Sequence, residues 1–139
     1  MAIPPREPLE LRIPRRLESP NQSRGAHWRV RHRIAQEWEQ EIAIEAVRRG
    51  AGLWITRQPP AGKMRVEVER HLPSLRNAIR DDDNLRFAVK PLLDALKRQY
   101  LIRGDSRKWL DHPTPTQHVS PDGKDYTVIR IAPVAEVVS

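Results

Sequence analysis

The sequence contains no cysteine, no long apolar segment and none of the common nucleotide-binding motifs. The lack of cysteine excludes disulfides, thiolate metal sites and a cysteine nucleophile. No run approaches the roughly 18 apolar residues that a membrane-spanning helix needs. No apolar core of a signal peptide follows Met1 either. We therefore expect no membrane contact and a cytoplasmic location.

Sequence motifs of several enzyme classes are also missing. There is no GxxxxGKS/T or GxGxxG loop for a nucleotide and no GxSxG turn for a serine hydrolase. The five histidines do not show the HExxH spacing or a similar one, which argues against a zinc site. Function must therefore be sought in the charged residues.

Basic residues outnumber acidic ones by 25 to 18, so the net charge is +7. The excess lies in residues 1–33 and 65–108, whereas residues 34–64 are neutral and residues 109–139 are acidic. A polyanionic partner fits this distribution, and nucleic acid is the commonest. A basic, solvated surface without a specific partner is the alternative.

Apolar periodicity predicts a single α+β domain over residues 1–139, with a small mixed sheet and two main helices. A kink at Pro91, or two short helices around it, is expected because proline lacks the N–H group that continues a helix. The proline-rich segment 113–123 is expected to be a loop. The expected elements are strands 9–13, 64–69 and 126–131, a helix over 26–49 and a second helix from about residue 83.

The most informative segment is the acidic run Asp81-Asp82-Asp83. Asp83 is suited to cap the helix that it precedes, because its carboxylate accepts hydrogen bonds from free N–H groups. In an extended stretch, Asp81 and Asp83 would instead share one face and offer hard oxygen ligands to Mg²⁺. Both interpretations remain open on the residues alone.

Other charged residues extend this cluster. Asp105 follows the second helix, and a chain that turns back there brings it near Asp83. Lys90 lies seven residues after Asp83, about two helical turns, where it either reaches a phosphate or is a solvated lysine. Basic residues flank the carboxylates on both sides, and they are suited to attract a DNA backbone. They are Arg76, Arg80, Arg103, Arg107 and Lys108.

Three spaced elements resemble the RusA family of Holliday-junction resolvases. They are Asp81-x-Asp83-Asn84-Leu85, then Lys90-Pro91-Leu92-Leu93-Asp94-Ala95-Leu96, then Gly104-Asp105-Ser106. The resemblance covers about 28 residues, 81 to 108, and the flanking elements agree with it only in pattern. It implies a RusA-like fold and a homodimer in a bacterial or phage-infected cell. The implied activity is that of a Mg²⁺-dependent endodeoxyribonuclease, with Mn²⁺ as an alternative ion, that nicks four-way DNA junctions symmetrically in recombination and repair.

The same resemblance implies roles for individual residues. Asp81, Asp83 and Asp105 correspond to the metal-binding aspartates, and Lys90 corresponds to the active-site lysine. The family often has two acids before the serine, where this chain has Gly104 and Asp105, so one supporting carboxylate is missing unless Asp82 compensates. The longer spacing from Asp83 to Lys90 resembles phage-type members, whose substrate could be another branched DNA.

The N-terminal segment offers further DNA contacts, because it contains Arg15, Arg16 and Arg24. A solvated arginine-rich loop is the alternative. Two other classes of function also remain. One is a basic DNA-binding module without catalysis, and the other is an interaction protein that pairs through the neutral helix 26–49.

Overall fold

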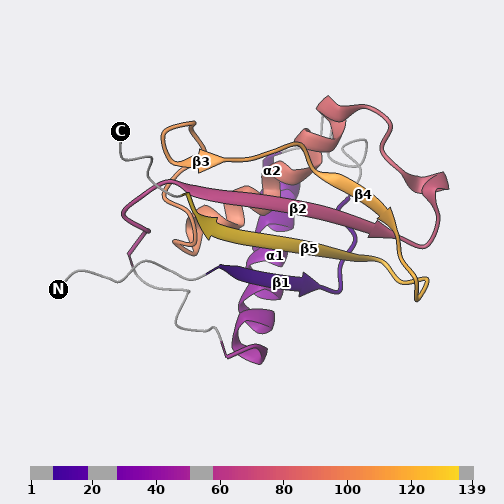
Figure 1. The fold of residues 1–139 in the computed structure, drawn as a ribbon, viewed down its shortest axis with the longest axis horizontal. Helices are drawn as coiled ribbons and strands as arrows, with labels where there is room; N and C mark the ends of the chain where they lie inside the picture. The colour runs from indigo at the N-terminus through magenta and orange to yellow at the C-terminus, as the bar shows by residue number, and fades with distance from the viewer. Residues whose placement is uncertain (1–7, 19–27, 51–57, 135–139) are drawn as a thin grey trace.

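The computed structural model describes residues 8–18, 28–50 and 58–134. Five strands form one mixed sheet, and two long helices lie against it (Figure 1). This arrangement confirms the predicted α+β class. In chain order the elements are β1 (Leu9–Ile13), α1 (Trp28–Arg48), β2 (Met64–Leu72), η3 (Leu75–Asn77), α2 (Asp82–Arg98), β3 (Leu110–Asp111), β4 (Thr116–Val119) and β5 (Tyr126–Pro133).

The sheet has the strand order β1-β5-β2-β3, and β4 also pairs with β2. Strand β5 is antiparallel to both β1 and β2, whereas β3 and β4 run parallel to β2. The longest strand, β2, therefore lies beside β5 on one side and beside β3 and then β4 on the other. This position makes β2 the frame on which the loops of the site are built.

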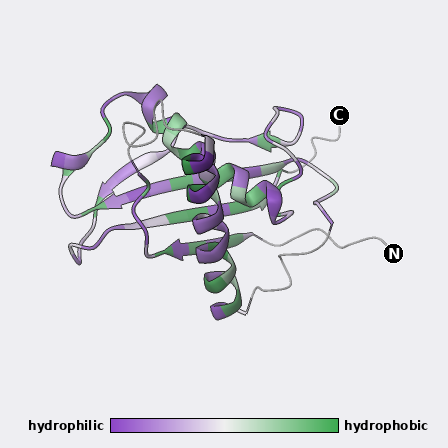
Figure 2. Cartoon of the chain, turned by 180° about the vertical axis from the view of Figure 1, so that it is seen from behind, coloured by the Kyte–Doolittle hydropathy of each residue, from purple (hydrophilic) through white to green (hydrophobic). Residues whose placement is uncertain are grey.

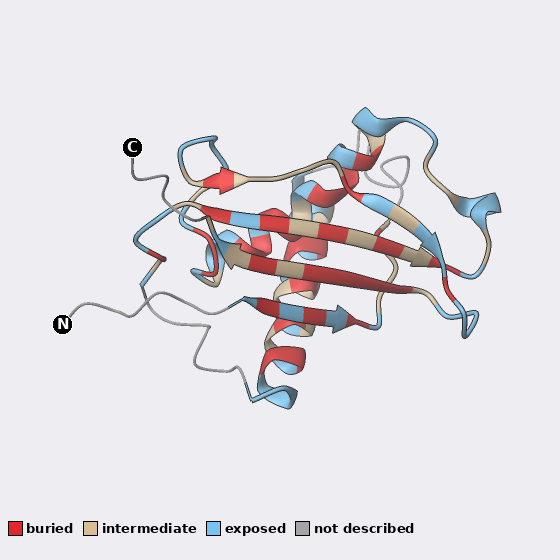
Figure 3. Cartoon of the chain, viewed as in Figure 1, coloured by how far each residue is buried: buried red, intermediate tan, exposed pale blue. Residues whose placement is uncertain are grey.

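The two faces of the sheet differ in polarity, as strand periodicity requires. In β2 the residues Met64, Val66 and Val68 are buried, whereas Arg65 is exposed and Glu67 is partly exposed. Figure 3 shows this alternation along the strands, and Figure 2 shows both helices in front of the other face. The apolar face packs on the helices, and the charged face is open.

Helix α1 buries one side because its apolar residues recur every four positions. Ile34, Trp38, Ile42 and Ala46 are all at most 7% exposed and belong to the core. The helix ends before Gly50, whose φ of +72° is a conformation that glycine adopts without strain. The predicted helix 26–49 is thus confirmed over residues 28–48, and its first two residues lie outside the described part.

Helix α2 differs from one of the two alternatives predicted around Pro91. It continues through Pro91 as one helix from Asp82 to Arg98, so the alternative of two short helices is wrong. Its apolar side is buried on both sides of the proline, at Leu85 and Val89 and again at Leu92, and this packing outweighs the lost backbone hydrogen bond. None of the described helices is long and apolar enough to cross a membrane.

The segment 113–123 is not only a loop, as predicted, because β4 lies within it. Prolines at 113 and 115 separate β4 from β3, since neither proline has an N–H group for the sheet. Strands of two and four residues between prolines are too short to show a pattern in the sequence. The apolar residues Trp54 and Ile55 lie outside the described residues.

Candidate metal-binding and nucleic-acid site

A buried arginine fixes the loop that leads to the aspartates. Arg70 is 2% exposed and lies on the buried face of β2, which it shares with Val66 and Val68. Its guanidinium donates hydrogen bonds to the carbonyl oxygens of Leu17 (2.8 Å) and Asn77 (2.9 Å) and to Oε1 of Gln117 (3.1 Å). Burial lowers the pKa of Arg70 from its ordinary value. The fork geometry of guanidinium lets one side chain hold three separate segments.

Gln117 of β4 continues this network to the start of the site. Its Oε1 accepts a hydrogen bond from the N–H of Ile79 (2.9 Å), and its Nε2 donates one to the carbonyl of Ile79 (2.8 Å). Ile79 lies two residues before Asp81. The side-chain amide of Gln117 thus binds both the N–H and the carbonyl of Ile79, as the backbone of a neighbouring strand would. These bonds fix the position of the loop just before α2.

Asp81 caps helix α2. Its backbone is extended, with φ −97° and ψ 123°, and its Oδ1 accepts hydrogen bonds from the N–H groups of Asp83 (2.8 Å) and Asn84 (3.4 Å). The prediction that Asp83 is the cap is therefore wrong by two residues. The expected extended stretch is wrong too, because Asp82 and Asp83 already belong to the first helical turn. Near the helix N-terminus the macrodipole favours their negative charge.

Asp105 lies in a different part of the molecule. It is exposed in the loop before β3, beside Gly104, where a Cβ atom would meet the ring of Trp109 at 3.2 Å. Trp109 accepts a hydrogen bond from the N–H of Met64, at the opposite end of β2 from Arg70. Figure 1 shows the loop between α2 and β3 at the opposite end of α2 from its start. One chain therefore does not bring Asp105 beside Asp81 and Asp83.

The acidic run offers Mg²⁺ an open, oxygen-only ligand set. Asp81, Asp82 and Asp83 are exposed, and no three of these and Asp105 bring their ligand atoms within 4.8 Å of one another. Mg²⁺ usually binds through one or two carboxylates, several waters and the phosphates of a substrate. Asp83 and the second oxygen of Asp81 offer carboxylate ligands of this kind to Mg²⁺ or Mn²⁺, whereas Asp81, Asp83 and Asp105 form no three-ligand cluster within one chain.

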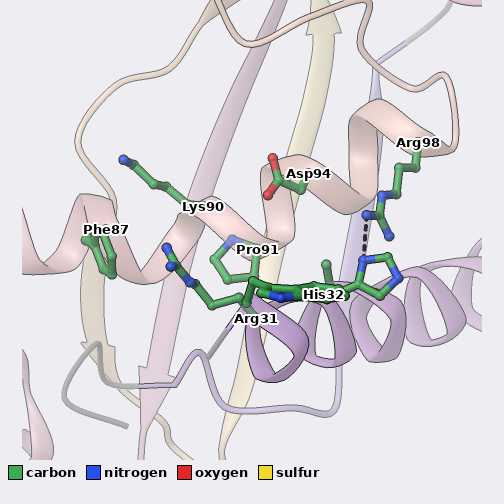
Figure 4. A pocket seen from close by; sticks show the side chains of 9 residues that line it. Arg31, His32, Phe87, Lys90, Pro91, Asp94 and Arg98 are labelled. Carbon is green, nitrogen blue, oxygen red and sulfur yellow. Dashed lines mark hydrogen bonds between the residues drawn. The ribbon is translucent and has the colours of Figure 1, made fainter. Parts of the chain in front are cut away.

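Lys90 lines a groove of about 300 Å³ between α1 and α2 (Figure 4). Its Nζ lies 5.1 Å from the centre of the Phe87 ring, and the exposed Trp28 also lines the groove. Arg98 crosses between the helices, because it hydrogen-bonds Nδ1 of His32 (2.8 Å). Sequence reasoning missed this groove, since its two walls are more than 50 residues apart. The aspartates at the start of α2 do not line it.

The predicted basic residues fall into two groups. Arg76, in η3, and Arg80 are exposed in the segment that precedes the acidic run, and neither forms an ion pair with any described residue. Arg103 and Lys108 lie on the Trp109 ring, at 4.4 and 4.9 Å from its centre, and Arg107 is exposed between them. Each of the two acidic positions therefore has basic residues beside it.

The N-terminal arginines are engaged within the protein. Arg15 forms ion pairs with Glu18 and Glu37, both at 2.7 Å. Arg16 binds both carboxylate oxygens of Asp125, at 2.7 and 3.2 Å. These pairs neutralise the charges that we expected to contact DNA, and they attach the segment after β1 to the rest of the fold. Arg24 lies outside the described residues.

Comparison with known proteins adds no assignment. The chain matches no model of a known protein family and no curated protein. The resemblance to the RusA family accordingly stays a prediction from the motifs.

Proposed function

We propose that this protein is a metal-dependent endodeoxyribonuclease that acts on four-way junctions or other branched DNA. The observation that carries the proposal is that the exposed carboxylates at the start of α2 follow a segment whose exposed Arg76 and Arg80 lack carboxylate partners among the described residues. Cations left without partners beside an acidic run suit a phosphate backbone held next to a metal. The RusA-like motifs support the same activity.

In this mechanism the protein supplies ligands, positioning and positive charge. Asp83 and the free oxygen of Asp81 would hold Mg²⁺, which as a Lewis acid would stabilise the charge that develops on the phosphate. Arg76 and Arg80 attract and orient the DNA backbone. The network of Arg70 and Gln117 holds the loop in place while DNA binds.

A homodimer belongs to this proposal. A four-way junction has two-fold symmetry, so a C₂ dimer presents one site to each of two strands. Paired nicks at symmetric positions then resolve the junction into two duplexes.

A second candidate is a DNA-binding module without catalysis. The observation that favours it is the use of Asp81 as a helix cap, together with the distance of Asp105 from the acidic run. Under this alternative the aspartates serve the helix, and only the basic residues contact DNA.

A nicking assay with one substitution separates the two. Asp83→Asn keeps the side-chain shape and leaves the Asp81 cap intact, whereas Asp81→Ala would also remove the cap and cost about 1 kcal/mol of stability. We expect Asp83→Asn to lose cleavage of an end-labelled junction in Mg²⁺ and to keep binding in Ca²⁺. Glu41→Gln makes the same carboxylate-to-amide change at a partly exposed position on α1, outside the motif and the groove, so it is the matched control and should cleave like the wild type.

The substrates are a junction, a flap, a duplex and a single strand. Cleavage of flaps in preference to junctions would indicate another branched DNA as substrate. A wild-type protein that shifts the junction in a gel and leaves every strand intact would support the binding module. Full cleavage by Asp83→Asn would contradict the metal site.

A further inference from the structure

The open face of the sheet carries three metal-ligating side chains in one place. Strand periodicity puts Glu69 and His71 on the same face of β2, and the register of β2 and β4 pairs His71 directly with His118. The ligand atoms of the three residues all lie within 4.8 Å of one another. We propose that Glu69, His71 and His118 bind one Zn²⁺ or a similar transition-metal ion. This site does not depend on the proposed nuclease function.

The distances need only small changes to accommodate an ion. Oε1 of Glu69 lies 3.0 Å from Nε2 of His71. Metal bonds of about 2.0–2.2 Å in a tetrahedral site separate neighbouring ligand atoms by about 3.4 Å. This pair therefore opens by a few tenths of an ångström when the ion replaces the proton that the two atoms share.

The third ligand is free to adjust. His118 is exposed, and its ring stacks on that of His71 with 4.9 Å between centres and 21° between planes. Nearly parallel rings do not direct their lone pairs at one point, so the His118 ring turns when it binds the ion. The turn gives up the stacking on His71 and one hydrogen bond, between Nε2 and Oγ1 of Thr116 at 2.8 Å.

Glu69 and His71 are oriented by neighbouring side chains that do not bind the ion themselves, as metal ligands usually are. Arg130 donates a hydrogen bond to Oε2 of Glu69 at 2.5 Å, which leaves Oε1 directed at His71. Tyr126 stacks on the other side of the His71 ring, with 4.3 Å between centres. Burial would raise the pKa of Glu69, but the hydrogen bonds from Arg130 and His71 outweigh it and keep the pKa below its ordinary value.

The donor set selects the class of ion. Two imidazole nitrogens and one carboxylate oxygen suit Zn²⁺ and its transition-metal neighbours, whereas Mg²⁺ and Ca²⁺ prefer oxygen alone. Three protein ligands leave the fourth position to water or to an anion. The linear spacing of the histidines gave no sign of this site, because His118 comes beside His71 only through the pairing of β4 with β2.

The test titrates untagged protein with Zn²⁺ by calorimetry and with Co²⁺ by visible absorption. We expect one ion per chain, intense Co²⁺ bands of low coordination number, and no displacement of Co²⁺ by excess Mg²⁺. His118→Ala and Glu69→Gln should each weaken binding at least about tenfold, since even residues behind the ligands are worth 10–100-fold. His32→Ala removes another exposed histidine, on α1, and should bind like the wild type.

Circular dichroism confirms that each variant is folded. If a variant fails to fold, the thermal midpoint of the wild type gives the answer instead, because an ion that binds only the folded state raises it. We expect a rise with Zn²⁺ and none with Mg²⁺. Absence of saturable Zn²⁺ binding, or equal binding by wild type, His118→Ala and Glu69→Gln, would overturn the proposal. Asp83→Asn should bind Zn²⁺ normally, so the outcome is separate from that of the nuclease assay.

Discussion

Replacing Arg70 by methionine should loosen the loop that carries the candidate site. Methionine keeps much of the length and the apolar packing of the side chain but has none of its donors. The carbonyl of Leu17 and the carbonyl of Asn77 then lose a hydrogen bond each, and Gln117 loses a third. The substitution therefore tests whether this network holds the segment between β2 and α2.

The size of the effect follows from the burial of these groups. A buried acceptor without a donor costs about 1–3 kcal/mol, and the carbonyl of Asn77 is nearer to solvent and costs less. Removing a buried charge returns part of its desolvation energy. We expect a net loss of about 2–3 kcal/mol in the free energy of unfolding. With a urea dependence of about 2 kcal/mol per molar, the midpoint falls by about 1–1.5 M.

Urea unfolding followed by circular dichroism measures this shift. Arg65→Met is the matched control, because Arg65 lies on the same strand but on the open face, where it pairs with Glu67 and Asp111. It should move the midpoint far less. Arg70→Lys keeps the charge but not the fork, and it should recover less than half of the loss. Equal midpoints for Arg70→Met and Arg65→Met would refute the reasoning.

Three further predictions concern the site and its surroundings. Lys90→Ala should slow single-turnover junction cleavage about 10²–10³-fold without weakening binding, if Lys90 acts on the developing charge; Lys97→Ala, further along α2, should not. Replacing Arg76 and Arg80 by alanine should make the log–log salt dependence of DNA binding shallower by about one to two units, and an unchanged slope would assign both to solvent. Burial lowers the pKa of His112 below its ordinary value of 6.5. As the pH falls, the unfolded chain therefore binds a proton at a higher pH than the folded protein does. Stability should therefore fall as the pH drops below about 6.5, and the urea midpoint of His112→Gln should change less between pH 7.5 and 5.5 than that of the wild type.

The parts of the fold that the sequence predicted are those with a long, regular pattern. In α1 an apolar residue at every fourth position, from Ile34 to Ala46, spans more than three turns, and in β2 apolar and charged residues alternate without a break from Met64 to Glu69. Patterns of this length reflect a whole buried face, so local reasoning finds them. The helix start was harder, because three successive aspartates are each suitable caps and only the backbone at Asp81 selects one.

The parts that local reasoning missed depend on pairing between distant segments. Strand β4 has four residues, and it is held mainly by its register with β2. The same register creates the cluster of Glu69, His71 and His118, in which His118 comes 47 residues after His71. Arg15 and Arg16 likewise form ion pairs with Glu37 and Asp125, so they are not free cations. No local sequence pattern connects these partners.

The prolines around the sheet limit how this protein can associate with further strands. Strand β1 ends the strand order on one side, and Pro8 and Pro14 flank its five residues. On the other side, prolines interrupt the run from β3 to β4. A proline offers no N–H group to an incoming chain, so each edge presents only a few consecutive donors and is a poor template for aggregation. A dimer of this protein is therefore expected to form through helices or loops rather than through a continuous intermolecular sheet.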